Sequence, residues 1–470
     1  MRMGYKEPFY KKPLRVRDPV HGFIGYDETE ERVINSPVLQ RLRGITQLAM
    51  TYLVYPGARH TRFEHSLGTM HVAGKMARQV GLSEDEIKLV RLAALLHDIG
   101  HGPFSHVSDV PMAVLTKEAG TLPEGVKPEK IHESITLSIL LERHEWWKGV
   151  LGEEHRKRAA AILADDDMRK KYKLKEEQPI LKEIVSGPVD ADKLDYLLRD
   201  TLFCGVKYGV IDIERIIDCF VPFERGDERW LAVRFDGVVA IEQLVVARYQ
   251  ITRQVYAHRV RRIAEKMLQR AILDAKDKDE EIHTLFSFNP QEERWWKTFL
   301  KSNDHWLMSR LEAVATRYPE STCAKMSERL AARRLLKEVY AQYISRLPWG
   351  YSDTQSFFET PEQRKRMEKK IAEELGVDEA LVIVDVRELK NPLHRSPEPR
   401  REGKIIVIDR NGRDQRLEDM KDSLSEKVKV ESEKNVYVYV PVDESDREKR
   451  QSLYKEYRKV VEKIVERFHE

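Results

Sequence analysis

Three features are scarce in this chain: cysteine, long apolar runs and an excess of charge of either sign. The 470 residues include only Cys204, Cys219 and Cys323, which stand far apart and form no CxxC pair. We therefore expect no disulfide framework and interpret these cysteines as structural. Lys and Arg number 82 against 79 Asp and Glu, a net charge of +3. Such a balance excludes an overall basic coat for nucleic acid or membranes, so nucleic-acid binding is not indicated.

The sequence also lacks an obvious membrane or export signal. No stretch of 18 or more apolar residues occurs, and the first residues, MRMGYKEPFYKKPLRVRD, contain no apolar signal-peptide core. We expect a cytoplasmic protein that does not bind membranes. At 470 residues the chain exceeds the size of a single core, which is about 250–300 residues, so two domains are expected.

The pattern from about residue 28 to 345 predicts mostly helices. In SEDEIKLVRLAALLHDIG, Ser83 and Glu86 form a capping box, apolar residues recur at helical spacing, and Gly100 is the expected stop. Further helices are predicted over 131–147 and 247–275. A β-hairpin is predicted over 230–242, with its turn at Asp236-Gly237.

The composition changes near residue 350. Short β-branched segments at 380–386, 404–410 and 436–442 predict strands, and a helix is expected to end the chain. The predicted fold is thus a mainly α core with a small hairpin over 1–349, followed by a small α+β domain over 350–470. The second domain carries no cluster of candidate catalytic residues, and we expect a structural or assembly role for it.

Residues 95–106, LLHDIGHGPFSH, bring polar chemistry to the end of an apolar helix. A buried aspartate such as Asp98 is costly unless a cation compensates it. His65 in RFEHSLG and the aspartates of VDADKLDYLLRD (189–200) are the candidates to complete a site with His97 and Asp98. Imidazoles and carboxylates without thiolates suit Mg, Mn, Fe, Zn or Ni. Spacing alone does not select which aspartate of 189–200 binds a metal.

The order His65, His97-Asp98, Asp192 resembles the metal site of HD-domain phosphohydrolases. The surrounding residues are similar to one branch, the deoxynucleoside triphosphate triphosphohydrolases, which include dGTPases and the sterile-alpha-motif and HD-domain enzyme. The matching stretches run from about residue 17 to 260: RDPVHGFI, QRLRGITQL, YPGARHTRFEHSLG, LLHDIGHGPFSH, DADKLDYLLRD and RQVYAHRV. The resemblance implies an HD helical fold, and we expect no sterile-alpha-motif domain in this sequence.

This resemblance implies a role for each matching residue. His65, His97, Asp98 and Asp192 would hold a divalent metal that activates water for attack at the α-phosphorus of a dNTP, releasing deoxynucleoside and triphosphate. His101, His106, His132 and Glu133 would lie beside it, with His106 as candidate general acid for the leaving 5′-oxygen. The implied substrate contacts are Gln47, Leu48, Arg62, Lys193, Tyr196, Asp200, Arg248, Tyr256 and Arg259. Among them, Tyr196 would crowd a 2′-hydroxyl and Asp200 would bond the 3′-hydroxyl.

Some positions depart from the family pattern. Where relatives read a guanine effector with an aspartate, this chain has Asn35, and Arg17 replaces a small amide; both changes count against guanine activation. Arg41 and Arg43 remain candidates for an effector phosphate. Ala257 replaces a larger polar residue near the base, so the base preference is not predicted. The resemblance further implies a homo-oligomer, for which we expect a dimer or tetramer, with any nucleotide effector bound between subunits.

Three other functions remain open from the sequence. An HD phosphohydrolase acting on a nucleoside monophosphate, a cyclic nucleotide or a nucleic-acid end would share the metal site and differ in the pocket. A nucleic-acid-binding regulator would have a degenerate HD site, against which the intact His and Asp set argues. A di-iron HD oxygenase would need further ligands, for which the sequence gives no positive sign.

Overall fold

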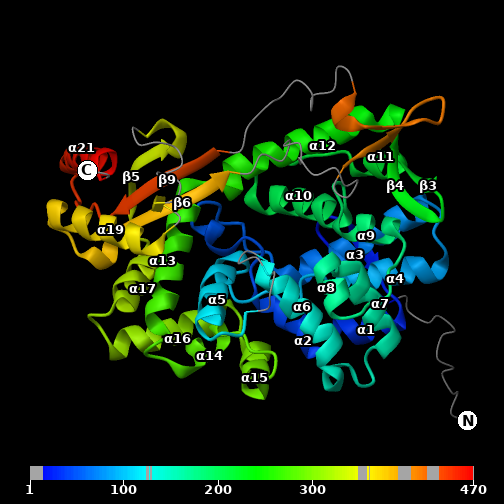
Figure 1. The fold of residues 1–470 in the computed structure, drawn as a ribbon, viewed down its shortest axis with the longest axis horizontal. Helices are drawn as coiled ribbons and strands as arrows, with labels where there is room; N and C mark the ends of the chain where they lie inside the picture. The colour runs from blue at the N-terminus through cyan, green and yellow to red at the C-terminus, as the bar shows by residue number, and fades with distance from the viewer. Residues whose placement is uncertain are drawn as a thin grey trace, which may run out of the picture.

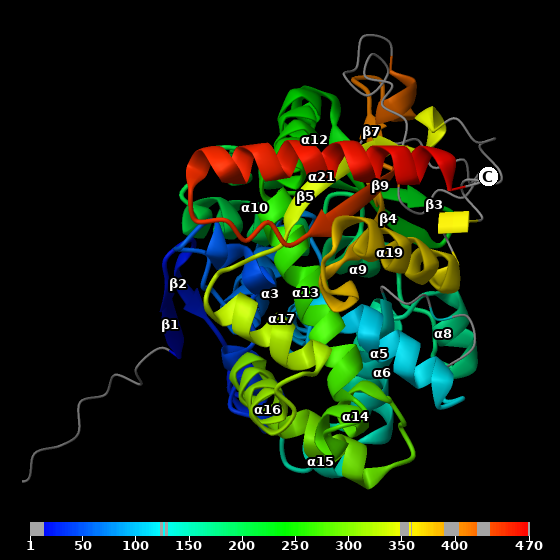
Figure 2. The ribbon, with the colours of Figure 1, turned by 90° about the vertical axis from the view of Figure 1, so that its left-hand side faces the viewer.

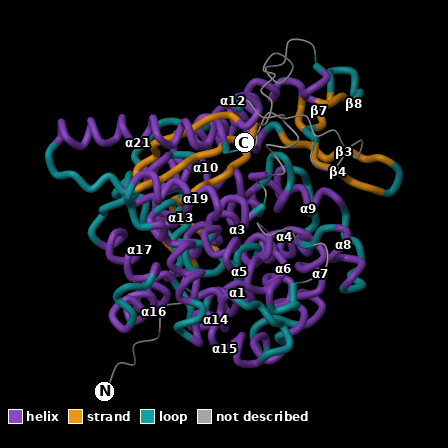
Figure 3. Tube along the Cα trace, turned by 60° about the vertical axis from the view of Figure 1, so that its left-hand side comes forward, coloured by secondary structure: helices purple, strands orange, loops and turns teal. Residues whose placement is uncertain are grey.

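Helices dominate the structure, a computed structural model that describes residues 14–122, 126, 130–347, 357–358, 360–389, 404–420 and 433–468. The longer strands form two groups on one side of the helical body (Figures 1 and 3). The chain begins with a two-stranded antiparallel ribbon, β1 (Arg15–Asp18) and β2 (Gly22–Gly25), joined through Gly22 at a φ of +75°. The predicted class, a mainly α HD core with a further α+β part, is confirmed.

Among the described residues between the ribbon and residue 204 there are ten α-helices. They are α1 (Glu28–Ile34), α2 (Pro37–Gln40), α3 (Arg62–Gln79), α4 (Glu84–Leu96), α5 (His106–Glu118), α6 (Ile131–Glu142), α7 (Glu153–Leu163), α8 (Asp166–Lys171), α9 (Pro179–Ser186) and α10 (Ala191–Cys204). Helix α3 lies at the centre and packs against both α4 and α10. The predicted capping box is present, since Ser83 and Glu86 each bond the other's backbone N–H.

Gly100 acts differently from the expected helix stop. Helix α4 already ends at Leu96, and its C-cap residue His97 has the backbone angles of a right-handed helix. Gly100 does not have a positive φ. A Cβ on Gly100 would lie 2.1 Å from the carbonyl oxygen of His132 and 2.5 Å from the nitrogen of Thr136. The glycine therefore allows α6 to approach the end of α4, and this contact brings His132 to the site.

The predicted hairpin over 230–242 is wrong in its second half. The hairpin consists of β3 (Phe220–Arg225) and β4 (Glu228–Arg234), and its turn contains Gly226 at a φ of +61°. After a short 3-10 turn at Phe235–Gly237, the chain enters α12 (Val238–Ile251). The run VVAIE suits a strand by composition, but Ile241, Leu244, Ala247 and Ile251 are buried at helical spacing.

The segment predicted as helix over 247–275 is interrupted. A π-helical turn, Thr252–Tyr256, follows α12, and α13 (Arg259–Ala275) starts after His258. Such turns occur frequently at functional sites, and this one carries Tyr256. The other α-helices between residues 205 and 347 are α11 (Ile213–Asp218), α14 (Glu280–Phe286), α15 (Glu293–Lys301), α16 (Asp304–Arg317) and α17 (Thr322–Ala331).

The C-terminal strands divide between two sheets. Strands β5 (Lys337–Tyr343), β9 (Glu433–Val440) and β6 (Ile383–Leu389) form an antiparallel sheet, on which α19 (Pro361–Leu375) and α21 (Arg447–Arg467) pack (Figure 2). Strands β7 (Ile406–Ile408) and β8 (Asp414–Arg416) instead extend the β3–β4 hairpin. Strand pairing therefore crosses residue 350 twice, and the division into 1–349 and 350–470 stays a prediction.

Candidate metal centre

The four side chains expected to bind a metal converge from three helices. His65 comes from the first turn of α3, His97 and Asp98 follow the end of α4, and Asp192 lies in the first turn of α10. Nε2 of His65 is 3.0 Å from an Asp192 carboxylate oxygen and 3.8 Å from one of Asp98. Nε2 of His97 is 3.3 Å from Asp98 and 3.9 Å from Asp192. One small space thus receives two imidazole nitrogens and two carboxylates.

The orientation of both imidazoles fits a metal ion. Nδ1 of His97 donates to the carbonyl of Ala94 at 2.7 Å, and Nδ1 of His65 contacts Asp195 at 2.7 Å. The Nε2 atoms therefore face the space between the carboxylates, where both are buried without a hydrogen-bond partner among the described residues. Buried polar atoms are rarely left unpaired, so a cation that accepts both lone pairs fits these residues.

Charges around the centre keep its carboxylates ionised. Burial alone would raise the pKa of Asp98, but Arg62, with His97 and His101, holds that pKa well below its usual range. Burial is likewise outweighed at Asp192, where the imidazole of His65, 3.0 Å away, lowers the pKa of the carboxyl to about 2. Burial would lower the pKa of His65, yet Asp192 and Asp195 raise it to about 10. A metal binding here must displace the proton on His65.

A second histidine cluster adjoins the centre. The rings of His101 and His132 stack with centroids 3.9 Å apart, and the ring of His106 meets that of His101 edge-on at 4.8 Å. Nε2 of His101 lies 3.4 Å from Asp98, which links the two clusters. Glu133, also expected here, pairs with Lys130 at 2.7 Å. The histidines are thus brought together, whereas Glu133 has an exposed partner of its own.

The sequence analysis did not single out Asp109, which joins this cluster. One of its carboxylate oxygens contacts Nδ1 of His106 at 2.9 Å and Nδ1 of His132 at 3.0 Å. Burial would raise the pKa of Asp109, but His132 and His106 hold it far below the usual range; the pKa of His132 is raised in return. His106 keeps 62% of its side chain exposed. His106 precedes Asp109 by three residues on α5, and this spacing is the sequence signal that could have identified Asp109.

Two of the expected phosphate contacts share a cavity. Lys193 and Arg248 line a cavity of about 390 Å³ formed mainly by residues of α9 and its flanking loops, together with Trp230. Lys193 follows the metal-site residue Asp192, and its ammonium bonds Asp190 and the carbonyl of Gly187. Arg62 is instead buried between Asp98 and Ser105. It therefore supports the metal centre directly.

Tyr196, Asp200 and Tyr256 form the other expected group. The Tyr196 ring lies 6.5 Å from that of His65 and 6.3 Å from that of Tyr256. Asp200 accepts from the Tyr256 hydroxyl and contacts Nε2 of His60 at 2.7 Å. Burial raises the pKa of both tyrosines, so their hydroxyls stay protonated. His60, which the sequence analysis did not name, thus belongs to the support of Asp200.

Of the remaining expected contacts, Gln47 and Leu48 adjoin this group: the backbone N–H of Gln47 donates to the His60 carbonyl at 3.0 Å, and Leu48 belongs to the core cluster against which Tyr196 and Tyr256 pack. Leu48 is part of the hydrophobic core, while Gln47 is half-buried and its side-chain oxygen has no partner among the described residues. Arg259, at the start of α13, is exposed and its charge acts on His258 and Lys337.

The residues at the expected effector positions differ in exposure. Asn35 and Arg17 are exposed, and the Arg17 guanidinium lies 4.7 Å from the Phe23 ring centre. Arg41 is buried and donates to the carbonyls of Ile99, His101 and Ser302. It therefore holds the histidine-bearing loop in place.

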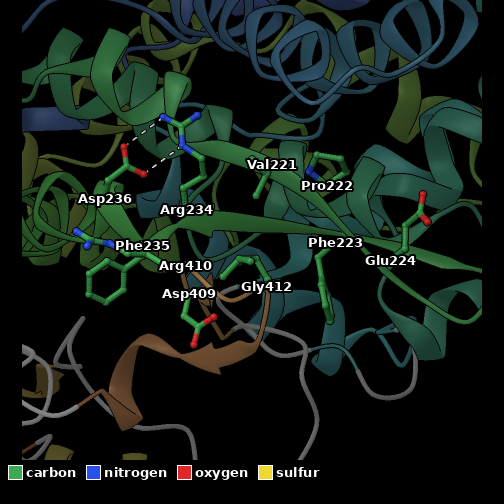
Figure 4. Close-up of a pocket in the computed structure, with 11 residues that line it drawn as sticks. Val221, Pro222, Phe223, Glu224, Arg234, Phe235, Asp236, Asp409, Arg410 and Gly412 are labelled. Atoms are coloured by element: carbon green, nitrogen blue, oxygen red, sulfur yellow. Dashed lines mark hydrogen bonds and ion pairs between the residues drawn. The ribbon is translucent and has the colours of Figure 1, made fainter.

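A separate pocket of about 730 Å³ opens between β3, β4 and the β7–β8 turn (Figure 4). Phe223, Phe235 and Arg410 are among its lining residues, and Arg234 and Asp236 pair at its edge. None of the residues expected at the active site lines it. In the part of the chain that the structure describes, no helix is both long and apolar enough to cross a bilayer.

Comparison with known proteins gives two family matches. The HD domain matches residues 62–197, and the HD associated region matches residues 211–411. The first match contains all four side chains of the candidate metal centre. The chain is 36% identical over 299 residues to an uncharacterised protein of Methanocaldococcus jannaschii, an alignment that covers 63% of this chain and 57% of that protein.

Named enzymes and solved structures are among the similar proteins. Human deoxynucleoside triphosphate triphosphohydrolase SAMHD1 is 32% identical over 286 residues, covering 56% of this chain and 44% of the human protein. The chain thus spans about half the length of these relatives. A phosphohydrolase structure from Bacteroides thetaiotaomicron is 26% identical, with a TM-score of 0.71 over 91% of this chain and 100% of that one. A structure from Aquifex aeolicus, also 26% identical, has a TM-score of 0.66 over 95% and 99%. The chain is therefore an HD-domain protein related to the SAMHD1 triphosphohydrolases, as the order of its motifs predicted.

Proposed function

We propose that this protein is a metal-dependent deoxynucleoside triphosphate triphosphohydrolase, which converts a dNTP to deoxynucleoside and triphosphate. One observation carries the proposal: Nε2 of His65 and Nε2 of His97 are buried, make no hydrogen bond among the described residues, and face the carboxylates of Asp192 and Asp98 at 3.0 and 3.3 Å. Two imidazoles and two carboxylates form a site for Mg, Mn, Fe, Zn or Ni. The similarity to SAMHD1 enzymes supports the dNTP as substrate.

The histidine cluster supports a route for the proton. When bound, the divalent cation supplies an acidified water and neutralises phosphate charge. His106 is exposed, and Asp109 holds its Nδ1, so Nε2 is free to donate a proton to the leaving 5′-oxygen. His132 shares Asp109 with His106, and His101 stacks on His132. Glu133 belongs to the same proposal as a more distant participant.

Positive charge and aromatic rings support the choice of substrate. A triphosphate needs cations. Lys193, which follows Asp192 in sequence, and Arg248 border one cavity, and Arg62 contacts Asp98. In the proposed mode, Tyr196 would crowd a ribose 2′-hydroxyl, while Asp200, held by Tyr256 and His60, would accept from the 3′-hydroxyl. Each Asp200 oxygen has a second lone pair for this bond. Gln47, Leu48 and Arg259 remain part of the proposed substrate-binding set.

The proposal extends to assembly and location. We expect a homo-oligomer, a dimer or tetramer, in the cytoplasm. A nucleotide effector between subunits is not favoured for guanine, because Asn35 and Arg17 occupy the positions where relatives read that base. Arg41 is unsuited to an effector phosphate, since three backbone carbonyls already bind its guanidinium.

Product analysis tests the proposal. The Mn²⁺-loaded protein is incubated with the four dNTPs, singly and mixed, and the products are resolved by ion-exchange chromatography. Deoxynucleoside with intact triphosphate is expected, and Asp192→Asn should abolish it. Turnover only in the mixture would reveal an effector site. No turnover in any combination, with hydrolysis of a monophosphate or cyclic nucleotide instead, would replace the proposal by the alternative HD phosphohydrolase.

A further inference from the structure

Behind the metal centre lies a buried carboxylate that none of the proposed chemistry uses. Asp195, one helical turn after Asp192 on α10, has no exposed surface. One oxygen contacts Nδ1 of His65 at 2.7 Å and the Arg199 Nε at 2.9 Å. The other contacts Nε2 of His21 at 2.6 Å and a second Arg199 nitrogen at 2.9 Å. Four contacts thus hold a carboxylate whose burial would otherwise be very costly.

The contact with His65 determines which ring nitrogen faces the metal centre. The Asp195 carboxylate accepts a hydrogen bond from Nδ1–H, so Nε2 is the ring nitrogen that faces Asp98 and Asp192. His97 reaches the same orientation through the carbonyl of Ala94. Carboxylates behind metal-bound histidines fix the tautomer and raise the basicity of the ligand. Asp195 stands in this position relative to His65.

The network continues into the N-terminal ribbon. His21 lies in the turn between β1 and β2, and Asp18 ends β1. Asp18 contacts the remaining Arg199 nitrogen at 2.8 Å and also accepts from the backbone N–H of His21 at 2.8 Å. All these side chains are buried. The ribbon therefore supplies His21, which contacts Asp195 directly, and Asp18, which holds the other partner of Asp195, Arg199.

The sequence of α3 leaves room for this arrangement. A Cβ on Gly68 would lie 1.9 Å from the Asp195 oxygen and 2.4 Å from an Arg199 nitrogen. Only a glycine at this position allows α10 to bring the Asp195–Arg199 pair against α3. The close approach of α10 to α3 at Gly68 and the four contacts of Asp195 are separate observations, and both indicate that the position of Asp195 is specified by the fold.

We propose that Asp195 is the positioning residue for the metal ligand His65, and that the β1–β2 ribbon belongs to the metal centre through His21 and Asp18. Metal binding and ribbon docking then stabilise each other, because each favours the same orientation of His65 and Asp195. This inference depends on the metal centre in the proposed function, but not on the identity of the substrate.

Mn²⁺ titration of the full-length protein tests the role of Asp195, with free Mn²⁺ followed by its EPR signal. Asp195→Asn is expected to weaken Mn²⁺ binding by about 10–100-fold. His21→Ala, which removes one of the four contacts, should weaken it in the same direction and less. The matched control is Glu368→Gln, which breaks the pair of the buried Glu368 on α19 with Arg270 on α13, 2.7 Å apart and on other elements than the ribbon, and should leave Mn²⁺ affinity unchanged.

Hydrogen exchange of the wild-type protein tests the ribbon without any variant. Mn²⁺ should slow exchange of the paired amides in residues 15–25 and leave the β3–β4 hairpin unchanged. Unaltered Mn²⁺ affinity in a folded Asp195→Asn, or in His21→Ala should Asp195→Asn not fold, would overturn the role of Asp195. Unchanged ribbon exchange would overturn the role of the ribbon. A wild-type protein that binds no Mn²⁺ would instead refute the metal centre of the proposed function.

Discussion

At the scale of single residues, the orientation of each histidine in the candidate centre is set by the partner of its Nδ1 atom. His65 and His97 come from different helices, yet a carboxylate and a backbone carbonyl turn the same ring nitrogen of each toward one space. Arg62 keeps Asp98 ionised at the edge of that space. These supports explain how a site rich in charge is buried in a body of leucine and alanine.

Asp98→Ala tests the ligand set. Asp98 contacts Arg62 and lies within 3.8 Å of His65, His97 and His101, so its removal affects both clusters. We expect the purified variant to lose its bound divalent metal and at least about 100-fold of its turnover. Elemental analysis and the triphosphate assay measure both. Asp212→Ala, at the exposed N-cap of α11, is the control and should retain both. A variant that retains metal and activity would contradict the ligand assignment.

The pair of Asp109 and His132 predicts a pH-dependent stability. The pKa of Asp109 is held below its usual value of about 4, so its contribution is lost as pH falls below that value. The pKa of His132 is raised above about 6.5, so its contribution is lost as pH rises through the higher folded value. Asp109→Asn should therefore destabilise most near pH 5–6, by about 3 kcal/mol.

Thermal unfolding of the metal-free protein and of Asp109→Asn between pH 3 and 9 measures this difference. The gap in Tm should narrow toward both ends of the range. A gap that stays constant across it would show that the two side chains do not stabilise each other as a charged pair.

Motif order predicted which residues to examine but not how they are supported. His65, His97, Asp98 and Asp192 do lie together, while their metal-binding roles stay predictions. Asp195 and His60 were missed because a single aspartate or histidine has no distinctive pattern, and their partners lie 130 and 140 residues away in sequence. Asp109 was missed although it lies three residues from His106, because its second partner, His132, is on another helix.

At the scale of elements, close helix contacts position the site. Helix α4 was predictable because its cap and apolar spacing are local signals. The hairpin near 230 was misplaced because an apolar β-branched run suits either structure, and burial against the core decided for α12. The π turn before α13 was not predictable, since no local pattern marks it.

Gly100→Ala tests the contact of α4 with α6. The added Cβ would meet the carbonyl of His132 at 2.1 Å, so α6 must move and His132 with it. We expect a loss of about 1–3 kcal/mol in the free energy of unfolding, together with reduced turnover. Chemical denaturation measures the first. Gly25→Ala, whose Cβ would meet nothing closer than 3.9 Å, should change stability by less than about 0.5 kcal/mol. Equal stability of the two variants would contradict the proposed close approach.

At the scale of the whole molecule, the C-terminal sheet is tied to the helical body through α13. Arg262, Lys266 and Arg270, at helical spacing, pair with Glu338, Asp385 and Glu368 at 2.9, 2.9 and 2.7 Å. Helix α13 follows the turn that carries Tyr256, so these pairs connect the C-terminal sheet and α19 to the helix that starts just after Tyr256. The pairing of β4 with β7 lay beyond sequence analysis, since strand partners 174 residues apart leave no local signal.

A double-mutant cycle on Lys266 and Asp385 tests this connection. Asp385 is buried, so Lys266→Ala leaves its carboxylate without its cation and should destabilise the protein. Lys266→Ala and Asp385→Ala together should cost less than the sum of the single changes, with a coupling of about 0.5–3 kcal/mol. Urea unfolding of the four proteins gives the value. Strict additivity would show that the pair does not contribute to docking.

The central claim is that activated water attacks the α-phosphorus of a dNTP at the His65, His97, Asp98 and Asp192 centre. The most direct test is hydrolysis of a dNTP by the Mn²⁺-loaded protein in H₂¹⁸O, followed by mass spectrometry of the products. The account predicts one ¹⁸O atom in the released triphosphate and none in the deoxynucleoside. Label in the deoxynucleoside, or a labelled deoxynucleoside monophosphate with pyrophosphate in place of triphosphate, would contradict it.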